Sequence, residues 1–499
     1  MRWKVVIGNL SSILKLFGLA FFIPIIPAIS FFEEPILFGF LPFNVIIFLF
    51  MASWTFSLSF LFKSIGKIED FRNEEAIVIV SSSWLILALI SSIPFLMIGV
   101  FQSPVNAFFE AMSGMTTTGA TVIKYPLEQY PKSIMLWRGL LQWMGGMGVI
   151  VLSVAILTKL SRGGLTLLES EAPGPSITRL KPKIKETAKI LWYIYGLLTF
   201  SLVILLLGAG VTPYNAVYHA FTTLSTGGFS PHTDSIGFYP PVVHWIIIFF
   251  MIAAGMNFSL HFQLFKGNIK RVFKNPELRV YLFLIIIGTI LTAIMLIGTG
   301  MGTLDAIREG MFQILAIITT TGYATVDFYN DWPEFGRMLL LVLMFVGGSA
   351  GSTSGGIKIV RITLIFKMIG RKFKEFINPR RVTVVRMGDE VITESMLNTV
   401  AMFFSAYLII FVIGALIMVA LGMDMISGIS ATATTIGNVG PGLGLVGPAE
   451  NFRAVPYYGR LVLALLMWIG RLEIFTAIVL FNPSLYKKRG LRRIFRIRR

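Results

Sequence analysis

Long apolar stretches separated by short polar loops make up most of the chain. A helix needs about 20 predominantly apolar residues to cross the hydrocarbon core of a bilayer, and stretches of that length recur from one end of the sequence to the other. Others between them reach only about a dozen residues, which is too short to cross. The pattern predicts ten membrane-crossing helices, at residues 12–30, 36–62, 76–100, 134–158, 187–208, 242–265, 280–298, 336–369, 395–421 and 457–481.

Four short segments of the chain resemble one another: TTTGAT at 116–121, LSTGGFS at 224–230, TTTGYAT at 319–325 and TTIGNVG at 434–440. Their central glycines, Gly119, Gly227, Gly322 and Gly437, are 108, 95 and 115 residues apart, which leaves room for two membrane helices between consecutive copies. Each segment follows one of the short apolar stretches and precedes a long one. The repeat therefore predicts a unit of helix, half-crossing helix, extended segment and helix, that is, a re-entrant loop.

The four extended segments have a chemistry that suits a dehydrated cation. Backbone groups at membrane depth cannot face lipid, so four such segments must face one another around water or ions. Their carbonyl and hydroxyl oxygens can replace the hydration shell of an ion, and glycine lets the backbone turn its carbonyls inward. None of the four cores contains a carboxylate, which favours a monovalent ion, and the C-terminal ends of the short helices also favour a cation. Any one segment could be an ordinary turn, but four in matching register indicate a selectivity filter.

These patterns predict an all-α polytopic membrane protein in which two extra N-terminal transmembrane helices precede four pseudo-symmetric helix–pore-loop–helix repeats. The expected segments are a two-helix extension at 1–70, pore repeats at 71–165, 180–275, 276–375 and 390–485, and a basic cytoplasmic tail at 486–499.

Composition agrees with a membrane location, since 55% of the residues are hydrophobic and 14% are charged. The net charge of +18 is concentrated in loops, at 159–189, 266–279, 367–386 and in the tail. Because cytoplasmic loops accumulate Lys and Arg, we expect both termini in the cytoplasm and interpret the basic tail as a topology signal rather than a nucleic-acid site. The N-terminus shows no cleavable signal pattern, and the absence of cysteine excludes disulfides and thiolate metal sites.

The second helix of the third repeat contains GGSAGSTSGG at 347–356. Each glycine costs up to about 1 kcal/mol in a helix, so the helix should break here, with Lys358 and Arg361 marking its cytoplasmic exit. A small-residue face for helix packing is the alternative. Residues 347–351 also match G-x-S-x-G, which makes an intramembrane serine hydrolase with Ser349 as nucleophile a remote alternative. No motif pairs this serine with a base among the histidines, which are His219, His232, His244 and His261.

Arg471 lies inside the last expected span, in WIGRLEIF at 468–475. A charge at membrane depth is costly unless it faces water or a partner, so we expect Arg471 to line the pore; an ion pair between neighbouring helices is the alternative. Glu473, two positions further on, should face elsewhere.

Several longer motifs extend over most of the chain: FFEAMSGMTTTGAT (108–121), LQWMGGMGVIVLSVAIL (141–157), LSTGGFS (224–230), MNFSLHF (256–262), GGSAGSTSGGIKIVR (347–361), GNVGPGLG (437–444) and WIGRLEIF (468–475). In these motifs the sequence resembles the Trk/Ktr superfamily of potassium-uptake proteins, and within it the TrkH-type membrane subunits. The resemblance implies repeats related to potassium-channel pore units, a filter at the Thr/Ser-Thr-Gly positions, and a gate formed by the glycine-rich loop and a pore arginine beneath the filter.

By this resemblance the filter consists of Thr117, Thr118, Gly119, Ser225, Thr226, Gly227, Thr320, Thr321, Gly322, Thr435, Ile436 and Gly437. The gate consists of Gly347, Gly348, Ser349, Gly351, Gly355, Gly356 and Arg471. Related plant and fungal sodium transporters carry serine at the first filter glycine, so Gly119 indicates potassium. The fourth repeat departs most from the pattern, at Ile436 and Asn438.

The resemblance also implies a homodimer in the cytoplasmic (inner) membrane of a prokaryote, with a TrkA-type nucleotide-binding regulatory subunit on its cytoplasmic side. Potassium is the expected transported ion, and we expect no organic cofactor and no enzymatic activity in this chain. Because the sequence contains no phosphate-binding loop motif, we expect ion movement to follow the gradient and the membrane potential. A sodium- or proton-coupled carrier for monovalent cations is the alternative to a gated, channel-like pore.

Overall fold

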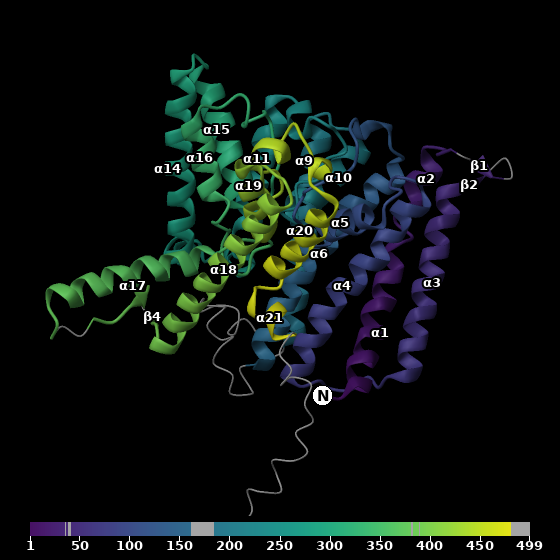
Figure 1. Cartoon of the computed structure of the whole chain (residues 1–499), viewed down its shortest axis with the longest axis horizontal. Helices are drawn as coiled ribbons and strands as arrows, with labels where there is room; N and C mark the ends of the chain where they lie inside the picture. The colour runs from purple at the N-terminus through teal and green to yellow at the C-terminus, as the bar shows by residue number, and fades with distance from the viewer. Residues whose placement is uncertain (35, 38–40, 161–183, 381–382, 389, 481–499) are drawn as a thin grey trace, which may run out of the picture.

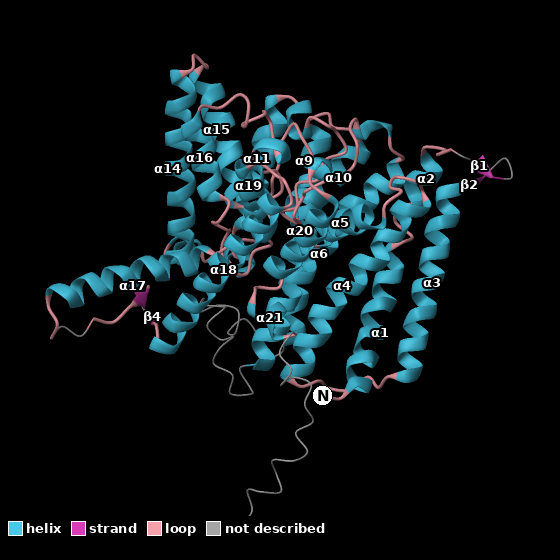
Figure 2. Cartoon of the chain, viewed as in Figure 1, coloured by secondary structure: helices cyan, strands magenta, loops and turns pink. Residues whose placement is uncertain are grey.

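The computed structural model describes residues 1–34, 36–37, 41–160, 184–380, 383–388 and 390–480. This part of the chain is a bundle of helices (Figures 1 and 2). Its strands form two short antiparallel hairpins, β1 (Ile36–Leu37) with β2 (Leu41–Pro42) and β3 (Arg386–Met387) with β4 (Glu390–Val391). Most of the basic 159–189 loop and the tail at 486–499 lie outside the described residues.

The N-terminal extension consists of α1 (Trp3–Ala20), α2 (Ile25–Ser30) and α3 (Phe43–Ile65). The first span starts at Trp3 rather than at residue 12, and α3 starts after Pro42 because the residues before it form the β1–β2 hairpin. Glycines of α1 allow close approach: a Cβ on Gly18 would lie 3.0 Å from the Phe56 side chain of α3, and one on Gly8 2.3 Å from the carbonyl oxygen of Lys67, just after α3. The extension therefore packs as a helical hairpin beside the first repeat.

Four units, each with an outer helix, a pore helix and an inner helix, follow the extension. The outer helices are α4 (Asn73–Met97), α9 (Ile184–Gly208), α14 (Pro276–Gly298) and α18 (Glu394–Ala420). The pore helices are α5 (Pro104–Met115), α10 (Pro213–Leu224), α15 (Thr303–Ile318) and α19 (Met425–Gly437). The inner helices begin with α6 (Lys132–Leu160), α11 (Pro241–Gly255), α16 (Glu334–Leu343) and α20 (Tyr457–Arg471). Figure 1 shows α5, α10 and α19 near the centre of the molecule.

The pore helices start at strong helix-initiation signals and are short. Pro104 and Pro213 occupy the first helical position, where proline fits because its missing N–H would have no partner there. Asp424 caps α19 by accepting a hydrogen bond from the Ser427 amide at 3.0 Å. With 12 to 16 residues each, these helices are too short to cross a bilayer. The predicted half-crossing helices are therefore present.

Three of the four inner helices are interrupted. The expected break at 347–356 is present, because α16 ends at Leu343 and α17 (Ile359–Ile377) begins beyond the glycine-rich loop. Two further breaks contradict the expected single spans. The α11 helix bends by 103° into α12 (Phe258–Phe265), where Asn257 caps the new helix by accepting a hydrogen bond from the Ser259 amide. The α20 helix is separated from α21 (Phe475–Val479) by Glu473, which has a left-handed backbone conformation.

The remaining elements are short helices that connect the units. They are α13 (Ile269–Phe273), and the 3₁₀ turns η1 (Leu127–Gln129), η2 (Ser235–Phe238), η3 (Gly444–Val446) and η4 (Phe452–Ala454).

The bundle exposes apolar side chains on its outside and buries polar side chains at the four repeated segments. Six described helices are long and apolar enough to cross a membrane, or seven if the bent α11–α12 pair counts as one span. Large apolar side chains such as Phe200, Ile294 and Leu416 are exposed on the outer helices, whereas most threonines of the four repeated segments are fully buried. Exposed apolar side chains together with buried polar ones are typical of a polytopic membrane protein.

Candidate functional site

Each pore helix ends in the same local conformation. The residues Thr117, Thr226, Thr320 and Asn438 follow the helix ends with left-handed φ angles of 51°, 53°, 56° and 53°. Two residues further on, Gly119, Gly228, Gly322 and Gly440 also have positive φ angles. These matching conformations define the structural register of the four segments.

The four glycines form a closed ring with the carbonyl groups of the neighbouring repeats. A Cβ atom on Gly119 would lie 2.2 Å from the Gly227 oxygen, on Gly228 1.8 Å from Thr321, on Gly322 2.0 Å from Val439, and on Gly440 3.0 Å from Thr118. The contacts thus run from repeat one to two, three, four and back to one. A side chain at these glycines would collide with a carbonyl group, so the ring requires glycine for close approach as well as for its φ angle.

The ring corrects the expected register in two repeats. In repeats one and three the expected residues, including Thr118, Gly119, Thr321 and Gly322, do lie in the ring. In repeat two the ring glycine is Gly228, one position after the expected Gly227.

In repeat four Thr435, Ile436 and Gly437 lie in the last turn of α19, and Asn438, Val439 and Gly440 form the loop segment. The similarity of TTIG at 434–437 to the other segments was misleading, because these residues belong to the pore helix. Within it, Thr435 Oγ1 donates a hydrogen bond to the Ala431 carbonyl at 2.7 Å.

Hydroxyl and amide groups line the pore-helix end of the ring. The Thr117 hydroxyl is buried and finds no hydrogen-bond partner among the described residues, and the same is true of the Asn438 side-chain oxygen. The Asn438 amide nitrogen donates to Thr118 Oγ1 at 3.0 Å and to the Met467 carbonyl at 2.9 Å. Burying an oxygen atom that accepts no hydrogen bond costs free energy. A cation that prefers oxygen ligands is therefore a suitable ligand for this position.

The other side of the ring opens into a partly open cavity, lined by residues that include Gly119, Gly228 and Gly322. His232 also lines it, and burial lowers the pKa of this histidine, so it adds no positive charge at neutral pH. Burial acts to raise the pKa of the adjacent Glu128, but hydrogen bonds from Thr233 outweigh it and hold that pKa below its ordinary value. The mouth therefore carries an ionised carboxylate and a neutral imidazole, and the charge of Arg138, which also lines the cavity, is paired with Glu110.

The glycine-rich loop lies directly against the opposite side of the ring. The Gly355 amide donates to Thr320 Oγ1 at 2.7 Å, and a Cβ on Gly355 would lie 2.3 Å from the Gly437 carbonyl oxygen. Thr353 Oγ1 donates to the carbonyl of Leu224, at the end of pore helix α10, at 3.0 Å. The loop thus occupies the space immediately beneath the ends of the pore helices.

Arg471 holds this loop from the last inner helix. Its Nη1 atom donates to the Thr353 carbonyl at 2.7 Å, while its Nε and Nη2 atoms are buried without hydrogen-bond partners. The alternative of an ion pair finds no support in the hydrogen bonds of Arg471 among the described residues. Glu473 does face elsewhere, since it forms an ion pair with Arg361 of α17.

Lys358 directly precedes α17, is buried and donates to the Ser354 carbonyl of the loop. Arg361, in the first turn of α17, is buried too, so both residues lie where the loop ends and the helix resumes, and their cytoplasmic placement stays a prediction. Burial of a lysine is tolerated here because its ammonium group is hydrogen-bonded to the loop backbone.

Ser349 lacks the partner that a nucleophile needs. Its hydroxyl group is buried without a hydrogen-bond partner, and the nearby backbone amide of Ser349 donates to the Gly255 carbonyl at 2.9 Å. His261 hydrogen-bonds the Ala253 carbonyl at 2.8 Å instead. The geometry gives the hydrolase alternative no support.

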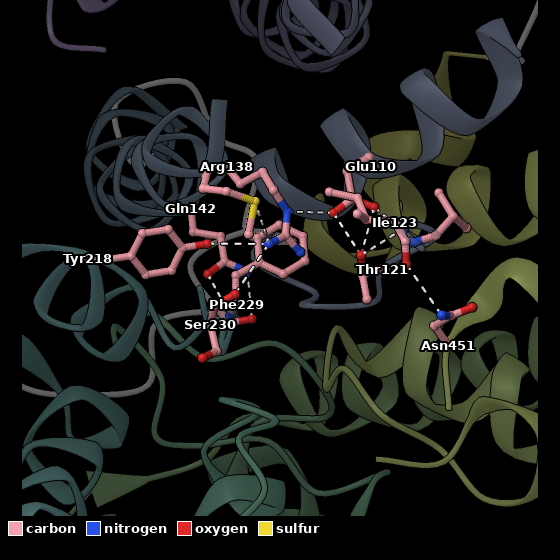
Figure 3. Close-up of polar contacts among 12 residues, drawn as sticks. Glu110, Thr121, Ile123, Arg138, Gln142, Tyr218, Phe229, Ser230 and Asn451 are labelled. Carbon is pink, nitrogen blue, oxygen red and sulfur yellow. Dashed lines mark hydrogen bonds and ion pairs between the residues drawn. The ribbon is translucent and has the colours of Figure 1, made fainter. Parts of the chain in front are cut away.

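Three residues behind the ring were missed by the sequence analysis: Glu110 on α5, and Arg138 and Gln142 on α6 (Figure 3). Glu110 and Arg138 form a buried ion pair at 2.7 Å, and Gln142 donates to the Gly227 carbonyl at 2.6 Å. A charged pair on two apolar helices is a detectable signal, but the contact of Gln142 with another repeat is visible only in three dimensions.

A ring of four re-entrant loops within an apolar helix bundle defines a polytopic, pore-loop membrane protein. The chain belongs to the TrkH family of cation transport proteins, whose model matches residues 43–488.

Named relatives agree with this assignment. The Trk system potassium uptake protein TrkH of Vibrio parahaemolyticus is 40% identical over 429 residues, covering 84% of this chain and 87% of the relative. The Trk system potassium uptake protein TrkG of Escherichia coli K12 is 32% identical over 421 residues, covering 83% and 86%. The crystal structure of the potassium transporter TrkH from Vibrio parahaemolyticus superposes with a TM-score of 0.87 at 34% identity, covering 98% of this chain and all of the other. The chain is a transport protein rather than an enzyme.

Proposed function

We propose that this chain takes up potassium across the cytoplasmic membrane, with the four-segment ring as its selectivity filter. The closed ring of glycine-to-carbonyl contacts carries this proposal, because it brings backbone oxygens from all four repeats to one place. Such oxygens can replace the hydration shell of a monovalent cation. The names of the relatives support potassium as the cation.

The filter in this proposal follows the structural register. It comprises Thr117 to Gly119, Thr226 to Gly228, Thr320 to Gly322 and Asn438 to Gly440. Ser225, Thr435, Ile436 and Gly437 then support the filter from the last turns of their pore helices or the residue after.

The test is cation flux into liposomes that contain the purified protein. An imposed negative interior potential should drive potassium inward faster than sodium. The potassium flux should not depend on a sodium or proton gradient. Equal potassium and sodium flux would contradict the filter. Single-channel currents would favour a gated pore, and strict dependence on a sodium or proton gradient would favour the carrier alternative.

The gate in this proposal is the glycine-rich loop together with Arg471. The loop lies against the ring through Gly355, and the Arg471 guanidinium group beneath it has two N–H-bearing nitrogens without partners. A fixed positive charge in a cation pathway raises the energy of an ion at that point. Opening would require the loop and the arginine to move away together.

We further propose that both termini lie in the cytoplasm, and that the protein forms a homodimer regulated by a TrkA-type nucleotide-binding subunit. In Figure 1 the N-terminus lies at the lower side of the molecule, together with α17, which carries exposed basic residues such as Lys372. The relatives are named as members of a Trk system, which agrees with a multi-component assembly.

A further inference from the structure

Repeat two lacks a side chain at one ring position where the other repeats have one. The residue before the ring glycine is Thr118, Thr321 or Val439 in repeats one, three and four, but Gly227 in repeat two. Gly227 does not have a positive φ angle, so its backbone conformation does not require glycine. Its place beside the ring is occupied by a residue from repeat one, because a Cβ on Gly227 would lie 2.4 Å from Gln142 Cδ.

Both polar atoms of the Gln142 amide bind the repeat-two segment. Nε2 donates to the Gly227 carbonyl at 2.6 Å, and Oε1 accepts from the Phe229 amide at 3.1 Å. The two bonds therefore hold the backbone immediately before and after the ring glycine Gly228. Gln142 is fully buried, so both bonds lie in an environment of low dielectric constant, which strengthens them.

The Glu110–Arg138 ion pair supports this contact from one helical turn away. Arg138 precedes Gln142 by four residues on α6, so both side chains lie on one face of the helix. The guanidinium group of Arg138 lies 3.9 Å from the centre of the Phe229 ring and donates to the Ser230 carbonyl at 3.4 Å.

Glu110 binds the equivalent stretch of repeat one, by accepting from the Val122 amide at 2.9 Å and from the Thr121 hydroxyl. Figure 3 shows the pair between the two segments. It therefore connects the segment that follows Gly119 with the segment that follows Gly228.

We propose that Gln142 is a specificity-determining positioning residue, which supplies to repeat two the side chain that the other repeats carry themselves. This inference rests on the proposed function of the ring as a filter. The Gly227 carbonyl lies against Gly119 in the ring, so its position sets the spacing between repeats one and two. Without the amide, this quadrant can relax inward around a smaller ion, and discrimination against sodium falls.

The direct test replaces Gln142 by methionine, which keeps the length of the side chain but removes its amide. We expect the potassium-to-sodium flux ratio in liposomes to fall by about tenfold, a factor at the lower end of what the loss of its two hydrogen bonds would give. Trp143→Phe is the matched control. It removes the adjacent, partly buried hydrogen bond from Trp143 Nε1 to Thr199 at 3.2 Å, which does not involve the ring, and the ratio should stay at the wild-type value.

A second test moves the side chain back to repeat two. Gly227→Thr alone should abolish transport, because the new Cβ would collide with Gln142. Combining it with Gln142→Gly should restore transport and part of the selectivity. Glu110→Gln should lower the flux ratio in the same direction as Gln142→Met.

Two results would overturn the inference. The first is an unchanged potassium-to-sodium flux ratio in the folded Gln142→Met protein. The second is that transport does not recover in the Gly227→Thr, Gln142→Gly double variant while Gln142→Gly alone keeps wild-type selectivity. Absence of potassium selectivity in the wild-type protein would instead contradict the proposed function. A failure of the filter proposal and a failure of the Gln142 proposal are therefore distinguishable.

Discussion

Three threonines at the pore-helix ends adopt a conformation that is unfavourable for them. Left-handed φ angles are disfavoured for β-branched residues, yet Thr117, Thr226 and Thr320 have φ angles between 51° and 56°. Asn438 takes the same position in repeat four, and asparagine tolerates this conformation well. Retaining threonine at such positions indicates that its hydroxyl group is needed there, which agrees with a site that binds a cation through oxygen.

Gly119→Ser tests the ring at the scale of one residue. Serine would have to adopt a φ angle of 81° and place its Cβ 2.2 Å from the Gly227 carbonyl oxygen, which must then move. We expect potassium flux to fall and the share carried by sodium to rise, measured as isotope flux into liposomes. Gly196→Ser is the control, because nothing lies within 4 Å of a Cβ at Gly196. Unchanged selectivity would remove Gly119 from the filter.

Arg471→Ala tests the gate charge. Removing the guanidinium group takes away both the fixed positive charge and the bond to the Thr353 carbonyl, so basal potassium flux should rise. Arg471→Lys keeps the charge and should leave basal flux close to that of the wild type. A basal flux that is the same in the alanine variant, the lysine variant and the wild type would argue against a gating role.

At the scale of elements, breaks in the inner helices build the site. The bend between α11 and α12 exposes backbone groups that bind the glycine-rich loop: the Ser349 amide donates to the Gly255 carbonyl, and the Phe258 amide donates to the Gly351 carbonyl at 3.1 Å. Broken helices at membrane depth are stable only where other protein groups satisfy the freed backbone. The break in repeat two and the loop of repeat three therefore depend on each other.

Glu277 provides a test at this scale. It is buried at the start of α14 and accepts a hydrogen bond from the Ala350 amide at 2.7 Å, so it fixes the outer edge of the loop. We expect Glu277→Ala to loosen the loop and raise basal potassium flux, with a smaller rise for Glu277→Gln, which keeps an acceptor oxygen. Glu334→Ala is the control, since Glu334 is in the first turn of α16 and its side chain is 88% exposed. If all three variants had the basal potassium flux of the wild type, Glu277 would have no role in holding the loop.

For the whole molecule, the distribution of charge sets the orientation in the membrane. In the proposed topology, the exposed basic residues of α17, such as Lys372, lie on the cytoplasmic side, as the positive-inside rule expects. The ring lies between its outer cavity and the glycine-rich loop, so in the proposed topology an entering cation would meet the proposed filter before the proposed gate.

The absence of native cysteine allows a direct test of orientation. Glu334→Cys should react with a membrane-impermeant maleimide in intact cells, and Lys372→Cys should react only after the membrane is permeabilised. Both side chains are well exposed, at 88% and 71%. Labelling in the opposite order would reverse the proposed topology.

Local sequence patterns determined the repeat architecture. Span length, short pore helices and the glycine-rich interruption all follow from rules that act within one segment: the thickness of the bilayer, helix initiation at proline, and the low helix propensity of glycine. These features correspond to the observed pore helices and to the break between α16 and α17.

Tertiary structure decided the register and the partners. Only the three-dimensional ring shows that Gly228 and Gly440, rather than Gly227 and Gly437, are the equivalents of Gly119. The reason is that the amino-acid sequence of one segment does not determine its φ angles or its close contacts with other repeats. The same holds for the bend after Gly255 and for the binding of Gln142 to repeat two. The sequence by itself determined that four glycine-centred loops return through the membrane, and packing among the repeats determined which atoms they present to one another.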